Sequence, residues 1–103
     1  MDRYEVPRDG DRDLRFEGEI IARASSRKHE GPANTRWNEL TLYRTQGGKL
    51  VAQKIGRTQW QGEVDRHEAV VGDERAVTSF FGYSTAAKEI YTKAGIDAAV
   101  TVE

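Results

Sequence analysis

One stretch decides the fold: WNELTLYRT (37–45), QGGK (46–49), LVAQKIGRTQW (50–60), QGEVDR (61–66) and HEAVV (67–71). Runs rich in β-branched and aromatic residues flank Gly47 and Gly48, and paired glycines supply the positive φ angles that a tight hairpin needs. The stretch therefore predicts a β-meander, with strands over 37–45, from residue 50 onward, and over 67–71. Gly56 lies inside the second of these strands and predicts a bulge or a bend there.

The segment before this stretch carries another strand. From Leu14 to Ala24, apolar and small residues alternate with charged ones, which is the period of a half-buried strand. Ile21 breaks the alternation, so either a bulge lies nearby or the second face of the strand is partly covered. Residues 1–13 mix Asp, Arg, Gly and Pro without a period. They predict either a short edge strand over 4–6 or a partly ordered arm.

Residues 25–36 contain no large apolar side chain and predict a loop of about a dozen residues. Two interpretations of this loop stay open. It is either a solvated hairpin loop or a basic flap, in which Arg27, Lys28, His29 and Arg36 lie against the sheet.

The last third of the chain changes from strand to helix periodicity. Asp73 is suited to cap a short helix that ends at Gly82, and Ser84 or Thr85 is suited to cap a second helix over 86–94. Gly95 falls at the left-handed position after this second helix, where the Schellman motif places Ile96 against Tyr91. The tail 97–103 either adds one more strand or frays.

These elements predict an α+β fold in a single domain, residues 1–103. We expect an antiparallel β-meander of about four strands, with the two short C-terminal helices packed on one face through Phe80, Phe81, Ile90 and Tyr91. The other face would be left partly to solvent. Both faces of the central strands carry bulky residues, so we expect Tyr43 to be buried and at least one tryptophan to be exposed.

Composition narrows the class of protein. The chain has 103 residues, no cysteine and a formal net charge of −1, so disulfides and cysteine chemistry are excluded. No run approaches the roughly 18 apolar residues of a membrane span, and the first residues are charged, so we expect a cytoplasmic protein without membrane contact. The charge is segregated, because residues 23–66 carry +5 whereas residues 1–22 and 67–103 carry −3 each.

Motifs for catalysis are weak. No serine lies in a Gly-x-Ser-x-Gly motif, and the two histidines, His29 and His67, are each followed by a glutamate that a strand would point to the opposite face. A hydrolase or nuclease site would need the fold to bring these histidines together with carboxylates. We therefore predict no catalytic residue, no metal and no cofactor.

The remaining signal is a basic sheet with interleaved aromatic residues, which could contact an acidic protein surface or stack on the bases of a single-stranded nucleic acid. The binding residues that we predict are Arg36, Trp37, Arg44, Lys54, Arg57, Trp60 and Arg66. The sequence favours a small non-enzymatic interaction domain, an adaptor or a stoichiometric inhibitor, with a protein partner. Direct nucleic-acid binding is the alternative.

One variant of the inhibitor hypothesis is a phage- or plasmid-type protein that blocks a nucleic-acid-targeting defence complex, although no single residue demands it. A homodimer would form if one face of the sheet stayed apolar, because two such faces can bury one another.

Overall fold

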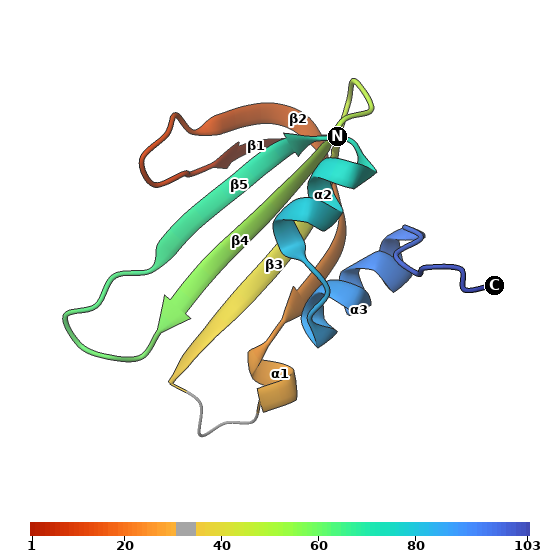
Figure 1. The fold of residues 1–103 in the computed structure, drawn as a ribbon. Coiled ribbons are helices and arrows are strands. Elements are labelled where there is room, and N and C mark those ends of the chain that lie inside the picture. The colour runs from red at the N-terminus through yellow and green to blue at the C-terminus, as the bar shows by residue number, and fades with distance from the viewer. Residues whose placement is uncertain (31–34) are drawn as a thin grey trace.

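The computed structural model describes residues 1–30 and 35–103. Within them, five antiparallel strands form one sheet in chain order (Figure 1). The strands are β1 (Asp2–Val6), β2 (Leu14–Ser25), β3 (Arg36–Thr45), β4 (Leu50–Thr58) and β5 (Arg66–Gly72). The α+β meander is therefore confirmed, with β1 formed by the segment for which an edge strand or an arm was expected.

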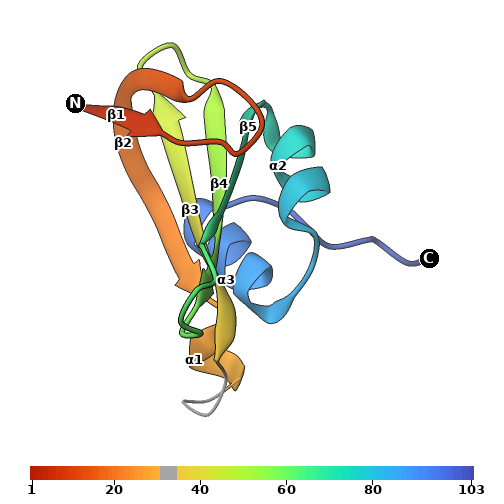
Figure 2. The ribbon, with the colours of Figure 1, turned by 90° about the vertical axis from the view of Figure 1, so that its left-hand side faces the viewer.

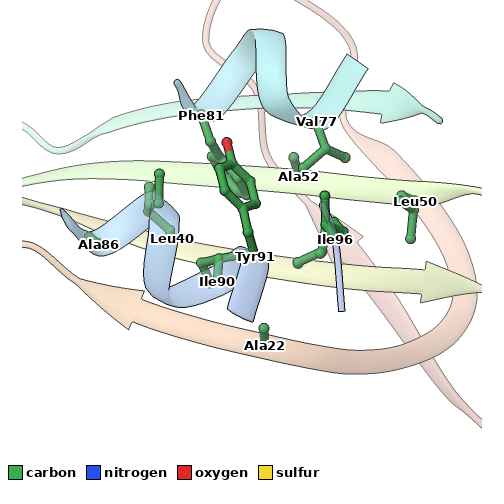
Figure 3. Packing of buried hydrophobic residues seen from close by; sticks show 12 residues of the cluster. Ala22, Leu40, Leu50, Ala52, Val77, Phe81, Ala86, Ile90, Tyr91 and Ile96 are labelled. Atoms are coloured by element: carbon green, nitrogen blue, oxygen red, sulfur yellow. The ribbon is translucent and has the colours of Figure 1, made fainter. Parts of the chain in front are cut away.

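Two C-terminal helices pack on one face of this sheet, as predicted. They are α2 (Glu74–Phe81) and α3 (Thr85–Ala94), and we call the face that they cover the helix face. Side chains from the sheet and the two helices meet between the layers (Figure 3). The buried cluster comprises Ala22, Leu40, Leu42, Leu50, Ala52, Val77, Phe81, Ala86, Ala87, Ile90, Tyr91 and Ile96.

The ends of both helices follow the predicted capping chemistry. The Asp73 side chain accepts a hydrogen bond from the Ala76 N–H at 3.0 Å, and Ser84 accepts one from the Ala87 N–H at 3.2 Å. Gly95 adopts the left-handed conformation, and the Ile96 N–H donates to the Tyr91 carbonyl at 2.9 Å. The Schellman motif is thus confirmed.

Three local predictions need correction. The segment predicted as a loop contains α1 (Arg27–Glu30), a single helical turn, while residues 31–34 of that loop lie outside the described residues. Only Gly48 of the glycine pair has a positive φ. Gly56 pairs in regular register with Asn38 and Arg66, so no bulge forms there. For the tail 97–103, where a strand or a frayed end was expected, the structure shows no strand.

The predicted irregularity at Ile21 is a β-bulge in β2. Ile20 lies opposite Tyr43 and Ala22 lies opposite Leu42, so the extra residue turns these two side chains to opposite faces of the sheet. Three residues earlier, the backbone of β2 at Gly18 approaches the Arg44 carbonyl so closely that a Cβ atom would collide with it. Glycine and bulge together let β2 bend.

The bend folds β1 and the first half of β2 over the second face of the sheet, which we call the ribbon face (Figure 2). Buried Val6, Tyr43, Val51 and Ala69 form a second cluster there, packed against Tyr4, Leu14, Phe16 and Ile20. We expected this face to stay partly open to solvent. The β1–β2 ribbon covers one end of this face and leaves the rest of it uncovered.

Two edges of the sheet, that of β5 and that of the second half of β2, are contacted by other parts of the chain. The loop after β1 reaches β5, where the Asp9 N–H donates to the His67 carbonyl and the Asp9 carboxylate accepts the His67 N–H, each at 2.8 Å. Because β1 pairs only with Leu14–Gly18, the rest of β2 has a free margin. There the Lys93 ammonium donates to the Arg23 carbonyl at 3.0 Å. Among the described residues, no helix is long and apolar enough to cross a membrane.

Candidate interaction surface

The strands divide the predicted binding residues between the two faces of the sheet. Because side chains alternate along a strand, Arg36 and Arg44 share the helix face with Leu40 and Leu42 of β3. Lys54 of β4 and Arg66 of β5 lie on the same face, and Lys54 reaches over the Phe80 ring at 5.1 Å. Trp37 and Arg57 project from the ribbon face. Trp60 lies in the loop between β4 and β5. The predicted set is therefore not one continuous patch.

Carboxylates pair with most of the predicted cations. One Arg36 nitrogen contacts both carboxylate oxygens of Glu63, at 2.9 and 3.1 Å. Lys54 lies 3.4 Å from Glu68, and Arg66 lies 3.8 Å from the same carboxylate. Arg44 makes no ion pair in the described part of the chain. Exposed pairs of this kind add little to stability, but they offset the positive charge that phosphates would need.

Arg57 is the most heavily paired of these residues. Its guanidinium lies 2.7 Å from the Asp65 carboxylate and 3.3 Å from the Glu39 carboxylate. The hydrogen bond to Asp65 is the main reason why the pKa of Arg57 is raised, and the same bond lowers the pKa of Asp65 below its ordinary value.

Two cations of the basic segment before β3, Arg27 and Lys28, contact the rest of the protein. The Arg27 guanidinium lies over the Trp37 ring at 4.1 Å from its centroid, a cation–π arrangement. Lys28 lies 3.4 Å from Glu89 of α3. The side chain of His29, the third residue of the predicted flap, lies outside the described residues. Arg27 and Lys28 thus hold the start of this segment against the sheet and α3.

The loop between β4 and β5 presents an exposed apolar tip. Trp60 is 55% exposed and Val64 is 83% exposed. The predictions that at least one tryptophan is exposed and that Tyr43 is buried are therefore confirmed. Arg36 and Arg66 flank this loop and line a hollow of about 440 Å³ with Val64. We call Arg36, Trp60, Val64 and Arg66 the tip surface.

Hydrogen bonds fix the conformation of this tip. The Trp60 indole N–H donates to the Thr35 hydroxyl at 3.0 Å, and its backbone N–H donates to the Thr58 hydroxyl at 3.1 Å. The Thr58 hydroxyl contacts Glu63, the partner of Arg36, at 3.1 Å. The backbone of Trp60 and the N–H of its indole are therefore both held before any partner arrives.

The described residues hold no cluster of three or more metal-ligating side chains. His67 lies in β5, where its Nδ1 is enclosed without a hydrogen-bond partner among the described residues. The hydrolase hypothesis required His67 and His29 to meet, and the His29 side chain lies outside the description. The predictions of no catalytic residue and no cofactor stay predictions.

Sequence reasoning missed two groups of residues. Val64, Glu63 and Thr35 complete the tip, and only the position of Val64 between charged residues of a turn could have signalled an exposed apolar side chain. Arg23 and Gln53 line a hollow on the ribbon face. Their proximity depends on the register of three strands, which the sequence does not determine.

Comparisons with protein-family models, with curated proteins and with solved structures found no match to this chain.

Proposed function

We propose that the chain is a non-enzymatic interaction domain, an adaptor or a stoichiometric inhibitor, that binds a protein partner through the tip surface. The observation that carries the proposal is Trp60, whose ring is more than half exposed although its backbone and its indole N–H are both tied down. Exposed apolar area that exceeds a single side chain marks contact sites, and this loop exposes two large apolar side chains, Trp60 and Val64.

A fixed tryptophan is well suited to anchor a protein partner. Tryptophan and arginine are enriched among the residues that dominate binding energies, and they act best at the centre of a ring of contacts that exclude water. Val64 adds a second exposed apolar side chain in the same loop, and the exposed guanidinium groups of Arg36 and Arg66, which line a hollow with Val64, supply polar contacts. Because the tip is already ordered, binding would cost little conformational entropy.

Charge favours a protein over a nucleic acid. Binding to the phosphate backbone draws its affinity from cations that exchange counterions for phosphates. Around the tip, Arg36 is paired with Glu63 and Arg57 is paired with Asp65 and Glu39. A phosphate would have to displace these carboxylates, whereas a protein surface can accommodate the pairs as they are.

Affinity capture from an extract of the native host tests the proposal, with the wild type, Trp60→Ala and Tyr83→Ala as baits. Tyr83 is a matched control, because it is also an exposed aromatic residue, at 58%, but lies between α2 and α3. We expect one protein to be retained by the wild type and by Tyr83→Ala, to be reduced at least tenfold with Trp60→Ala, and to resist nuclease treatment.

Two results would contradict the proposal. If every captured protein is retained equally by Trp60→Ala, the tip surface is not the binding site. If the Trp60-dependent capture disappears after nuclease treatment, the partner is a nucleic acid. In that case, titration with a labelled oligonucleotide should show an affinity that falls steeply with salt.

A further inference from the structure

A row of polar side chains crosses the ribbon face beyond the part that β1 and β2 cover. The strand register places Arg23 opposite Thr41, Thr41 opposite Gln53, and Gln53 opposite Ala69. All four therefore project from the same face. The neighbouring row contains Tyr43 and Val51 of the buried cluster, so these polar groups begin where the apolar packing ends.

The Gln53 amide in this row is held in a fixed orientation. Its side-chain oxygen accepts a hydrogen bond from the Tyr43 hydroxyl at 2.6 Å. Gln53 is only 8% exposed and Tyr43 only 6%. Among the described residues the amide NH₂ of Gln53 donates to no protein atom. Unlike the Nδ1 atom of His67, this NH₂ group is not fully enclosed by protein. Two donors on a nearly buried side chain are thus free to bind a ligand.

Arg23 lines the same hollow two strands away from Gln53, and it has no counter-ion in the described part of the chain. Its charge acts on Tyr43, where it lowers the pKa of the phenol and partly offsets the increase caused by burial. Its backbone is fixed as well, because the Lys93 ammonium binds the Arg23 carbonyl. The Arg23 guanidinium therefore adds a positive charge, unpaired among the described residues, to the hollow that also holds the two Gln53 donors.

These side chains line a hollow of about 550 Å³, within the size range of small-molecule sites. Two carboxylates reach this hollow, and both are already paired: Glu39 with Arg57, and Glu89 with Lys28 and Lys93. The charged side chains of the lining carry four positive and two negative charges, and among the described residues Arg23 is the cation of this lining without an ion pair. The hollow thus attracts anions.

We propose that the ribbon face binds the oxyanion group, carboxylate or phosphate, of a small organic molecule in the hollow beside Arg23, Thr41 and Gln53. The guanidinium offers parallel N–H donors that match the two oxygens of such a group. The Gln53 amide and the Thr41 hydroxyl add further donors, and Ile55 offers apolar contact to the rest of the molecule. This site does not depend on the tip surface or on the proposed function.

An NMR titration tests the site with four probes: inorganic phosphate, phenyl phosphate, benzoate and the neutral analogue benzamide. The reporters are the Arg23 Nε–H and the Gln53 NH₂ signals. We expect saturable shifts of both reporters with benzoate or with phenyl phosphate, and none with benzamide. Whichever of benzoate and phenyl phosphate binds more tightly tells whether the natural ligand carries a carboxylate or a phosphate. Inorganic phosphate measures how much the phosphate group contributes without the ring.

Variants separate this site from a general attraction of anions. Arg23→Gln should weaken binding at least tenfold, and the spectrum of this surface variant reports directly whether it is folded. The matched control is Arg44→Gln, because Arg44 is also exposed and without an ion pair among the described residues but lies on the helix face. Arg44→Gln and Trp60→Ala should leave the affinity unchanged.

Three results would overturn the proposal. The first is the absence of a saturable shift with any of the anions. The second is an equal loss of affinity in Arg23→Gln and Arg44→Gln, which would indicate binding by net charge alone. The third is equal binding of benzamide and benzoate, because the oxyanion would then contribute nothing.

Discussion

Asp9 binds both backbone groups of His67: its N–H donates to the His67 carbonyl, and its carboxylate accepts the His67 N–H, each at 2.8 Å. These two residues are 58 positions apart and belong to opposite ends of the sheet. The pair therefore fastens the loop after β1 to β5 and keeps the β1–β2 ribbon folded over the ribbon face.

Replacing Asp9 by alanine should destabilise the fold by about 1–2 kcal/mol, because the His67 N–H loses a charged acceptor. Urea unfolding measures the change, and amide hydrogen exchange at His67 should accelerate in the variant. Asp11→Ala is the control, because within the described residues Asp11 bonds to its neighbours Arg8 and Arg12 alone. Equal stability of the two variants would show that the Asp9–His67 contact does not hold the ribbon.

Gly18→Ala should destabilise the protein by about 2 kcal/mol or more, because the new methyl group meets the Arg44 carbonyl and the backbone of Thr45. Gly47→Ala is the matched control. A methyl group there meets only the Thr45 hydroxyl, at 3.9 Å, and the stability should change by less than about 0.5 kcal/mol. If chemical denaturation gives the same midpoint for both variants, the bend in β2 does not require glycine.

The glycines that end the two helices should differ in their tolerance of alanine. Both have a φ of 72°, and a methyl group at either position has no atom within 4 Å, so only backbone conformation distinguishes them. Gly95 has a ψ of 28°, the left-handed region, and Gly95→Ala should cost about 1 kcal/mol. Gly82 has a ψ of −149°, close to a region that is almost exclusive to glycine, so Gly82→Ala should cost about 2–3 kcal/mol. Thermal unfolding of both variants gives the order, and the reverse order would refute the assignment.

Asp65 should titrate below its ordinary pKa of 3.8 in the folded protein, because Arg57 stabilises the carboxylate. Since the pKa is lower in the folded state, the Arg57 contact stabilises the protein above the unfolded pKa and ceases to do so as the pH falls through the folded value. Carboxyl-detected NMR measures the midpoint, which should rise in Arg57→Gln. The control is Lys54→Gln, because Lys54 pairs with Glu68 instead. If the titration midpoint of Asp65 is the same in the wild type and in Arg57→Gln, the prediction is wrong.

Local chemistry was the most predictable part of the fold. The caps at Asp73 and Ser84 and the motif at Gly95 follow from residues within one helical turn of each other. The irregularity at Ile21 could be inferred because alternation has a strict period. The sequence could not decide between the two explanations of this irregularity. The structure contains both of them, a bulge at Ile21 and a partly covered second face.

Contacts between strands were beyond the reach of the sequence. The predicted binding residues were chosen by residue type along three strands. Which of them share a face depends on the register of these strands. Glu63 and Asp65 pair with Arg36 and Arg57 only because the loop after β4 folds back. Gly56 was expected to bend its strand, whereas Gly18 marks the actual close approach, and nothing local distinguishes these two glycines.

The hydrogen bond from the Lys93 ammonium to the Arg23 carbonyl affects the tendency of the protein to aggregate through the edge of β2. An unpaired strand offers a template on which another molecule can add a strand of its own, which is the first step toward cross-β fibres. Lys93 occupies a carbonyl that the incoming backbone would have to reach, so the incoming strand must either break this charge-assisted hydrogen bond or bury the ammonium group, which costs desolvation energy. This lysine therefore helps to keep separate copies of the chain from aggregating through β2.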